Sequence, residues 1–198
     1  MLTMADHIRP SFAREHVAPR SGALLYELLL VASGSLIMAA SAWIALPLPF
    51  SPVPVTAQTF AVLLVGSALG ARRGAAAALA YLAEGCSGLP VFAGGAAGAH
   101  VFLGATGGYL AGFVPGAWLC GALAERGWDR RVSTTLLSMA FGNLVILAPG
   151  LLWLARLVGP ERVLALGLLP FLPGDLVKIA LAAALLPLAW KGLAPGRR

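Results

Sequence analysis

The sequence has few charged side chains for its length. Of 198 residues, 14 are Lys or Arg and 8 are Asp or Glu, so 11% are charged, whereas 59% are hydrophobic. An ordinary soluble domain is about 25% charged, so these charges cannot cover a water-facing surface, and a soluble globular fold is excluded. Each bilayer-spanning helix needs about 20 apolar residues. The sequence therefore predicts an all-α integral membrane protein with about six transmembrane helices, in one domain at 23–192 between cytoplasmic tails at 1–22 and 193–198.

Several motifs of catalysis and metal binding are also missing. The chain has no Gly-x-x-x-x-Gly-Lys-Ser/Thr segment, no His-Glu-x-x-His helix and no Gly-x-Ser-x-Gly elbow. Its three histidines, His7, His16 and His100, are scattered, and its two cysteines, Cys86 and Cys120, fall near opposite ends of the expected helices. We therefore expect no enzyme activity, no ATP hydrolysis by this chain, no metal, no cofactor and no disulfide.

Apolar runs and prolines set the expected helices. The first run covers 24–46 and is stopped by Pro47, Pro49, Pro52 and Pro54, which predict an extended loop. The remaining runs cover 56–71, 74–82, 101–124, 134–157 and 174–190. The run at 74–82 is too short to span alone, so it is either completed by 90–97 or sits in a locally thinned or protein-covered position.

The basic residues favour one orientation. A net charge of +6 in a soluble protein would suggest nucleic acid, but here Lys and Arg gather in alternate loops, which is typical of membrane topology. Six spans put eleven of them on one side, namely Arg9, Arg14, Arg20, Arg72, Arg73, Arg126, Arg130, Arg131, Lys191, Arg197 and Arg198. Only Arg156 and Arg162 fall on the other side. Both termini are therefore predicted to be cytoplasmic, with no nucleic-acid partner.

One ionisable pair lies within an expected helix. Asp175 opens the run at 174–190, and Lys178 follows three residues later on the same helical face. Ionisable groups inside a membrane are expensive and often functional. The pair either neutralises itself as a purely structural element or binds a ligand at the mouth of a pocket, and the second reading is favoured because a self-cancelling pair costs desolvation without return.

Other polar and aromatic residues fall near the same, outer side of the membrane. Each has an ordinary explanation as a helix cap, an interfacial aromatic or a solvated charge. Their convergence with Asp175 and Lys178 predicts a small-molecule site with aromatic walls and a few polar groups. The candidates are Thr56, Gln58, Tyr81, Glu84, Phe92 and Tyr109. Asn143, inside the run at 134–157, is either an interhelical hydrogen-bonding group or a pocket residue.

Two stripes of small residues predict close helix contacts. Gly104, Gly108, Gly112, Gly116 and Cys120 recur at intervals of four, which favours packing within the chain over the alternative of an oligomer interface. Ala32, Ser35, Ala39 and Ala42 form a second stripe on the first expected helix, where a partner membrane protein could dock.

Four separated motifs resemble the BioY family, the biotin-binding S component of energy-coupling-factor (ECF) vitamin transporters. They are PVPVTAQTFAVLLV at 52–65, YLAEGCSGLPVF at 81–92, GATGGYLAGF at 104–113 and PFLPGDLVK at 170–178. The resemblance extends from about residue 22 to residue 192. It implies the six-helix ECF S-component fold in a bacterial inner membrane, and high-affinity binding of biotin on the extracytoplasmic side.

The resemblance also implies partners and roles. A transmembrane coupling subunit and ATP-binding-cassette ATPases would supply the energy, with docking on the stripe of Ala32, Ser35, Ala39 and Ala42. The alternatives are a solitary, self-associating biotin transporter, an S component for another small vitamin, or a packing protein whose ion pair is structural. For biotin, Asp175 would accept from ureido N–H groups and Lys178 would donate. Gln58 and Asn143 offer both functions, and Tyr81, Phe92 and Tyr109 supply apolar walls.

Overall fold

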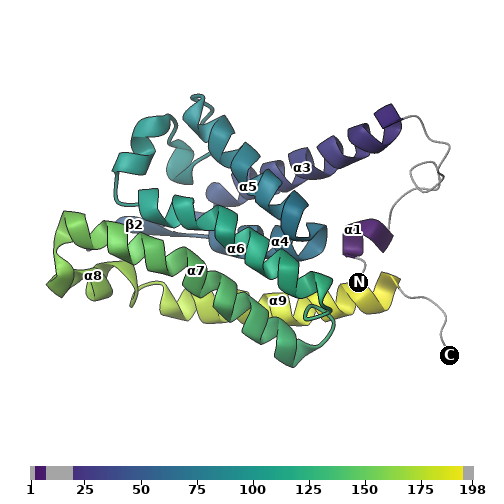
Figure 1. Cartoon of the computed structure of the whole chain (residues 1–198). Coiled ribbons are helices and arrows are strands. Elements are labelled where there is room, and N and C mark those ends of the chain that lie inside the picture. The colour runs from purple at the N-terminus through teal and green to yellow at the C-terminus, as the bar shows by residue number, and fades with distance from the viewer. Residues whose placement is uncertain (1–2, 8–19, 194–198) are drawn as a thin grey trace.

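The computed structural model describes residues 3–7 and 20–193, and most of them are helical (Figure 1). The helices are α1 (Met4–His7), α3 (Arg20–Ala42), α4 (Gln58–Leu69), α5 (Ala71–Cys86), α6 (Gly107–Glu125), α7 (Val132–Val158), α8 (Pro160–Gly167) and α9 (Leu172–Leu193). Two short 3-10 helices, η1 (Ala93–Gly95) and η2 (Ala99–Leu103), precede α6. Within the described part, α1 and the end of α9 lie at one end of the bundle and α8 lies at the other.

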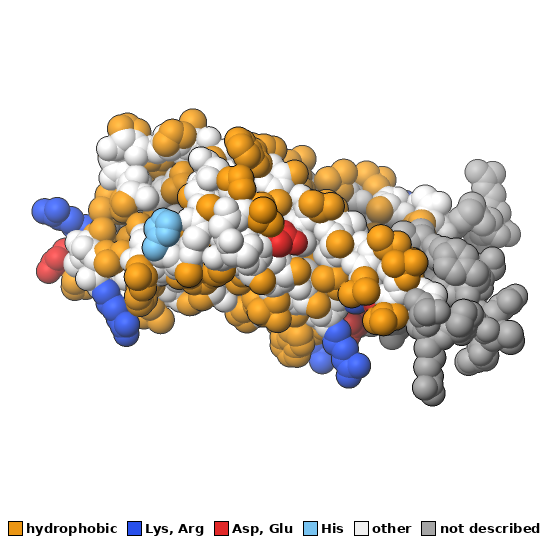
Figure 2. Space-filling view, turned by 90° about the horizontal axis from the view of Figure 1, so that it is seen from above, with side chains coloured by type: hydrophobic (Ala, Val, Ile, Leu, Met, Phe, Trp, Pro, Cys, Tyr) orange, Lys and Arg blue, Asp and Glu red, His pale blue; other side chains and the backbone are white. Residues whose placement is uncertain are grey.

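Among the described residues, four helices are long and apolar enough to cross a membrane. These segments are Gly22–Ala42, Gly107–Glu125, Val132–Val158 and Leu172–Leu193. The apolar α4 has 12 residues and α5 has 16, so both are shorter than the about 20 residues that a bilayer requires. The surface in Figure 2 is largely hydrophobic, with the basic side chains in view toward the two ends of the molecule. The prediction of a membrane protein is confirmed by these apolar helices.

A β-hairpin corrects the all-α expectation. The helix expected over 24–46 ends at Ala42, and β1 (Ala45–Leu48) pairs antiparallel with β2 (Ser51–Thr56), with Ala45 opposite Thr56. Proline blocks a helix interior because it lacks an N–H, but a two-stranded ribbon leaves alternate N–H groups facing outward, where none is needed. The expected extended loop is therefore an ordered hairpin.

Two other boundaries differ from the sequence expectation. The short run at 74–82 is the middle of α5, which extends to Cys86 and is not completed by 90–97. Residues 90–97 instead form a loop around η1. Gly94 has a φ of 66° and Gly95 a φ of 79°, a left-handed conformation that glycine adopts readily. The helix expected from 101 begins at Gly107.

The N-terminal tail expected at 1–22 is partly packed against the bundle. Met4 and Ala5 are buried, and the hydroxyl of Tyr26 on α3 donates to the carbonyl of Ala5 over 2.8 Å. Arg73 at the start of α5 pairs with Asp6 (2.8 Å) and with Glu27. Arg9 and Arg14 of the expected tail lie outside the described residues, as do Arg197 and Arg198 at the other terminus.

The far end of α9 is held at the same end of the bundle by Trp190. Its indole N–H donates to a carboxylate oxygen of Asp129, in the connection between α6 and α7, and the guanidinium of Arg130 lies 4.5 Å from the ring centroid. The ring of His7 packs edge-on against it at 4.8 Å. Burial raises the pKa of the Asp129 carboxyl. Trp190 thus fixes the C-terminal end of α9, whereas Asp175 and Lys178 lie near its N-terminal end.

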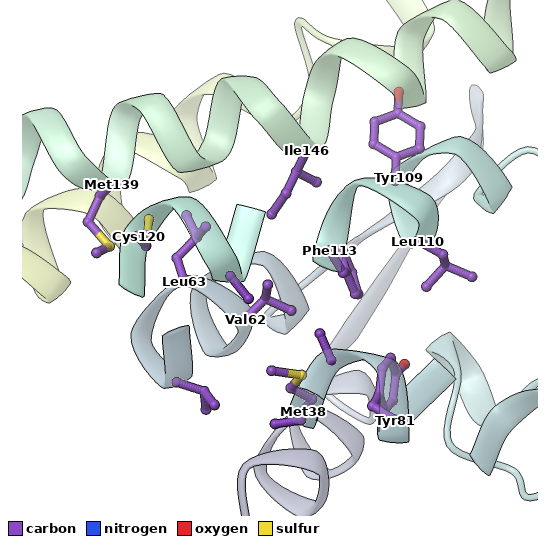
Figure 3. Packing of buried hydrophobic residues seen from close by; sticks show 14 of the residues in the cluster. Met38, Val62, Leu63, Tyr81, Tyr109, Leu110, Phe113, Cys120, Met139 and Ile146 are labelled. Carbon is purple, nitrogen blue, oxygen red and sulfur yellow. The ribbon is translucent and has the colours of Figure 1, made fainter. Parts of the chain in front are cut away.

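The glycine stripe of α6 packs within the chain, as predicted. A Cβ added to Gly112 would lie 2.7 Å from the Cα of Ile146 on α7, and one added to Gly116 would lie 2.8 Å from the Ile146 side chain. Farther along, the thiol of Cys120 donates to the carbonyl of Ser138 over 3.3 Å. Figure 3 shows Ile146, Met139 and Cys120 where α6 and α7 face each other.

The second small-residue stripe is not a free surface. Ser35, Ala39 and Ala42 are buried, and only Ala32 is exposed. Beside them, a Cβ on Gly34 would lie 2.8 Å from the Cβ of Ala77 on α5. The small residues let α3 approach α5 and α4 closely, so the expected docking surface is wrong for this stripe, and the outward face of α3 is instead leucine-rich.

Gly112→Ala should lower the melting temperature of the purified protein in detergent. The added methyl group has no space against the Ile146 backbone, and overpacking costs about 1–3 kcal/mol, more than the helix preference of alanine returns. The matched control is Gly22→Ala, whose Cβ would meet nothing within 4 Å. Equal melting temperatures for the two variants would contradict the close packing.

Candidate functional site

A cavity of about 250 Å³ lies at the end of the bundle that is remote from α1. The hairpin, the loop around η1, and α4, α6, α7 and α9 all contribute to its wall. The lining residues are Val53, Pro54, Thr56, Gln58, Thr59, Phe92, Ala93, Ala96, Val101, Thr106, Tyr109, Leu110, Phe113, Leu147, Phe171, Asp175 and Lys178. The wall is mostly apolar, with its charges confined to one pair.

The ion pair forms one polar wall of the cavity. Asp175 lies in the first turn of α9, where the helix dipole favours an anion, and its Oδ1 accepts from Lys178 Nζ at 3.1 Å. Its other oxygen accepts from Asn143 Nδ2 on α7 at 2.9 Å. Lys178 also donates to Thr59 Oγ1 on α4 at 3.0 Å. Three helices are therefore joined by one charge network, and Asp175 is 5% exposed.

Gln58 forms a second polar part of the wall, and Tyr81 holds it from behind. Gln58 opens α4 immediately after the hairpin, and its Nε2 donates to the hydroxyl of Tyr81 on α5. That hydroxyl donates in turn to the carbonyl of Val91 at 3.0 Å. Gln58 lines the cavity, whereas Tyr81 is fully buried behind it.

Aromatic rings close the remaining sides. The ring of Phe113 stacks on Tyr81 with centroids 6.3 Å apart, and Phe92 meets Tyr81 edge-on at 5.7 Å. In Figure 3, Phe113 lies between Tyr81 and Tyr109. The hydroxyl of Tyr109 donates to the carbonyl of Gly167, at the end of α8, over 2.9 Å. Phe171 lies 6.1 Å from the Tyr109 ring.

The hairpin is fastened over this end of the bundle. Ser51 donates its hydroxyl to the carbonyl of Leu166 on α8 at 2.7 Å, and Val53 is buried. At the base of the hairpin, the Ala57 N–H donates to the carbonyl of Ile44 at 3.0 Å. Val53, Pro54 and Thr56 reach the cavity as a result.

Comparison with known proteins assigns the family. The family model described as the BioY family matches residues 14–195. This chain belongs to the BioY family. The biotin transporter BioY of Rhizobium etli is 39% identical over 146 residues, covering 70% of this chain and 78% of that protein. The biotin transporter BioY of Thermotoga maritima is 38% identical over 143 residues, covering 72% and 82%.

A solved structure agrees with this assignment to the BioY family. The crystal structure of the S-component for biotin from an ECF-type ABC transporter superposes with a TM-score of 0.76 at 26% identity. The match covers 86% of this chain and 93% of that one. This superposition confirms the predicted ECF S-component fold. The family and its relatives are transporters rather than enzymes.

In this BioY chain, most of the residues singled out from the sequence converge on the cavity. Thr56, Gln58, Phe92, Tyr109, Asp175 and Lys178 line it. Tyr81 and Asn143 lie one layer behind and hydrogen-bond to Gln58 and Asp175. Asn143 borders a separate small cavity of about 10 Å³. Their part in binding a ligand stays a prediction.

Glu84 is the exception among the expected site residues. Its Oε2 accepts from the buried hydroxyl of Ser35 at 2.6 Å, which joins α5 to α3, and it does not line the cavity. Glu84 lies near the C-terminal end of α5, where its side chain is turned toward α3. Glu84 is therefore a packing contact rather than a cavity residue.

Sequence reasoning missed several wall residues. Thr59 meets Lys178 across 119 positions of the chain, and no local signal marks that contact. Phe113, Leu147 and Phe171 look like ordinary apolar helix residues, although Phe171 lies within the motif at 170–178. A spacing argument identifies the ion pair but cannot choose which neighbouring helices complete it.

Asn143→Leu should destabilise the protein even without a ligand. The change removes the donor to Asp175 Oδ2 and leaves a buried carboxylate oxygen unsatisfied, and a hydrogen bond to a charged group contributes about 1.5–3 kcal/mol. Chemical or thermal unfolding in detergent measures the loss. Leu144→Ala, at the next position and 59% exposed, should change stability by less than about 0.5 kcal/mol. An unaltered unfolding curve for Asn143→Leu would show that this contact does not stabilise α9.

Proposed function

We propose that this chain binds biotin in the cavity and takes part in biotin uptake. The observation that supports it most is the chemistry of the wall: one part-buried Asp–Lys pair, one amide and several aromatic rings, in a member of a family whose relatives are named biotin transporters. Biotin carries two ureido N–H donors, one ureido carbonyl, an apolar thiophane and a carboxylate. The ureido groups and the apolar thiophane find counterparts in the cavity.

The hydrogen-bond inventory fits the ureido ring. A carboxylate has about four lone-pair sites, and Asp175 uses one for Lys178 and one for Asn143. An ammonium has three N–H groups, and Lys178 uses two. The pair thus keeps acceptors and one donor for a ligand that offers both. Charge-assisted hydrogen bonds of this kind are the stronger class.

The proposal includes six membrane spans with both termini in the cytoplasm of a bacterial cell. The short helices α4 and α5 are backed by α6 and α3, which supports spanning in a position covered by protein. Arg72, Arg126, Arg130 and Lys191 are exposed at the end that holds α1, whereas Arg156 and Arg162 belong to the cavity end. The positive-inside rule then puts the cavity on the extracytoplasmic side.

The chain would act as an S component with a transmembrane coupling subunit and ATP-binding-cassette ATPases, with no cofactor of its own. The similarity to the S-component for biotin supports this arrangement. Solitary, self-associating uptake is the alternative. Biotin uptake by cells that produce this chain with and without the ATPase module separates the two.

Asp175→Asn and Lys178→Ala should each weaken biotin binding by about 1.5–3 kcal/mol, the contribution of a hydrogen bond to a charged group, or roughly 10- to 150-fold in Kd. Isothermal titration of the purified variants with biotin measures this. Lys191→Ala is the matched control, since it removes an exposed lysine from the opposite end of the same helix. Wild-type affinity in both site variants would reject the site, and an absence of binding by the wild-type protein would reject the function.

Topology is testable by cysteine labelling in intact cells. In a background of Cys86→Ser and Cys120→Ala, a membrane-impermeant maleimide should label Glu161→Cys on α8 from outside. Arg131→Cys, at the other end of α7, should react only after the membrane is opened. The reverse pattern would invert the proposed orientation, and labelling of both in intact cells would contradict a single orientation.

A further inference from the structure

A chain of two hydrogen bonds runs behind the cavity wall and has a defined direction. The carbonyl oxygen of Val91 can only accept, so the single hydroxyl proton of Tyr81 is committed to it at 3.0 Å. The phenolic oxygen is then available only as an acceptor for Gln58. Its partner must be the NH₂ group of the amide, as the contact from Nε2 has it.

This direction fixes which atom of Gln58 faces the cavity. With Nε2 turned back to Tyr81, the amide oxygen Oε1 is the free end, and it has no hydrogen-bond partner among the described residues. Gln58 is 4% exposed and borders the cavity, so reversing the amide would set an NH₂ group against the ligand and leave two oxygens facing each other behind it.

We propose that Tyr81, which does not touch the cavity, is a specificity-determining positioning residue that makes Gln58 an acceptor for a ligand N–H group. The inference rests on the proposed function and deepens it. A cyclic urea offers N–H donors along its ring, which suit an acceptor at this wall. A ligand with an acceptor in that position meets a lone pair instead of a proton.

The packing around Tyr81 permits a clean test. Its ring is held by Phe92 and Phe113 independently of the hydroxyl. Tyr81→Phe therefore keeps the ring contacts and removes only the hydrogen bonds to Gln58 and Val91. The amide of Gln58 is then free to turn in either sense, which lowers the fraction that presents Oε1 to the ligand and removes the fixed geometry of that oxygen.

The experiment is a double-mutant cycle with titration of purified protein by biotin. Tyr81→Phe should raise Kd about five- to tenfold when Gln58 is present, the range of one ordinary hydrogen bond. In a Gln58→Met background, the same change should alter Kd by less than about twofold, because no amide remains to be oriented. A structural hydroxyl that only anchors Val91 would weaken binding equally in both backgrounds, and that result would overturn the inference.

The matched control is Tyr109→Phe. Tyr109 also donates a buried hydroxyl to a backbone carbonyl, but it makes no hydrogen bond to Gln58. Its effect on Kd should be the same with and without Gln58. Coupling as large as that of Tyr81 would mean that the cycle reports general disturbance of the cavity, and the positioning role would be rejected.

Ligand selectivity supplies the second readout. Two analogues, each with one ureido N–H replaced by a ring oxygen, present an acceptor where biotin presents a donor. The wild-type protein should prefer biotin over the analogue changed at the Gln58 side, and Tyr81→Phe should reduce that preference about fivefold. If the wild-type protein binds biotin but Tyr81→Phe leaves both preferences unchanged, the inference fails while the proposed function stands. If the wild-type protein does not bind biotin, both the inference and the proposed function are rejected.

Discussion

The ion pair of Asp175 and Lys178 is the constraint on which the rest of the cavity depends. A charged pair in an apolar bundle is tolerated only when further hydrogen bonds satisfy it, and removing one partner of such a pair typically costs about 3–5 kcal/mol. Asn143 on α7 and Thr59 on α4 supply those bonds. The position of α9 is therefore tied to two other helices at the level of the cavity, while Trp190 fixes its other end.

Close packing of α6 against α7 makes that geometry possible. Gly108, Gly112 and Gly116 bring the two backbones together, so Asn143 on α7 and Tyr109 on α6 keep fixed positions relative to each other. Small residues act in this way in membranes because lipid supplies no hydrophobic drive between helices, and van der Waals contact has to replace it. The rigid helix pair is the frame, and the hairpin and the loop around η1 complete the wall.

The sequence predicted the parts of this arrangement that depend on local chemistry. Spacing of three put Asp175 and Lys178 on one face, and spacing of four marked the stripe on α6, and both hold in the structure. The sequence predictions that fail are those about which segments pack against each other. The small residues Ser35, Ala39 and Ala42 predict a close helix contact, but they do not indicate whether the neighbouring helix belongs to the same chain. In the structure that neighbour is α5 of the same chain. Prolines exclude a helix at 47–54 but do not distinguish a loop from a hairpin.

Two residues that orient the polar groups of the cavity, Asn143 and Tyr81, do not line it. Asn143 has to present its NH₂ group to Asp175, because a carboxylate only accepts, and Tyr81 requires the NH₂ group of Gln58 for the same kind of reason. In a water-filled site, solvent could compensate for a reversed amide. In a mostly apolar wall inside a membrane, an unsatisfied polar group costs several kcal/mol. The hydrogen bonds behind the wall therefore decide which atoms face the cavity, and an apolar cavity depends on them more than a solvated one does.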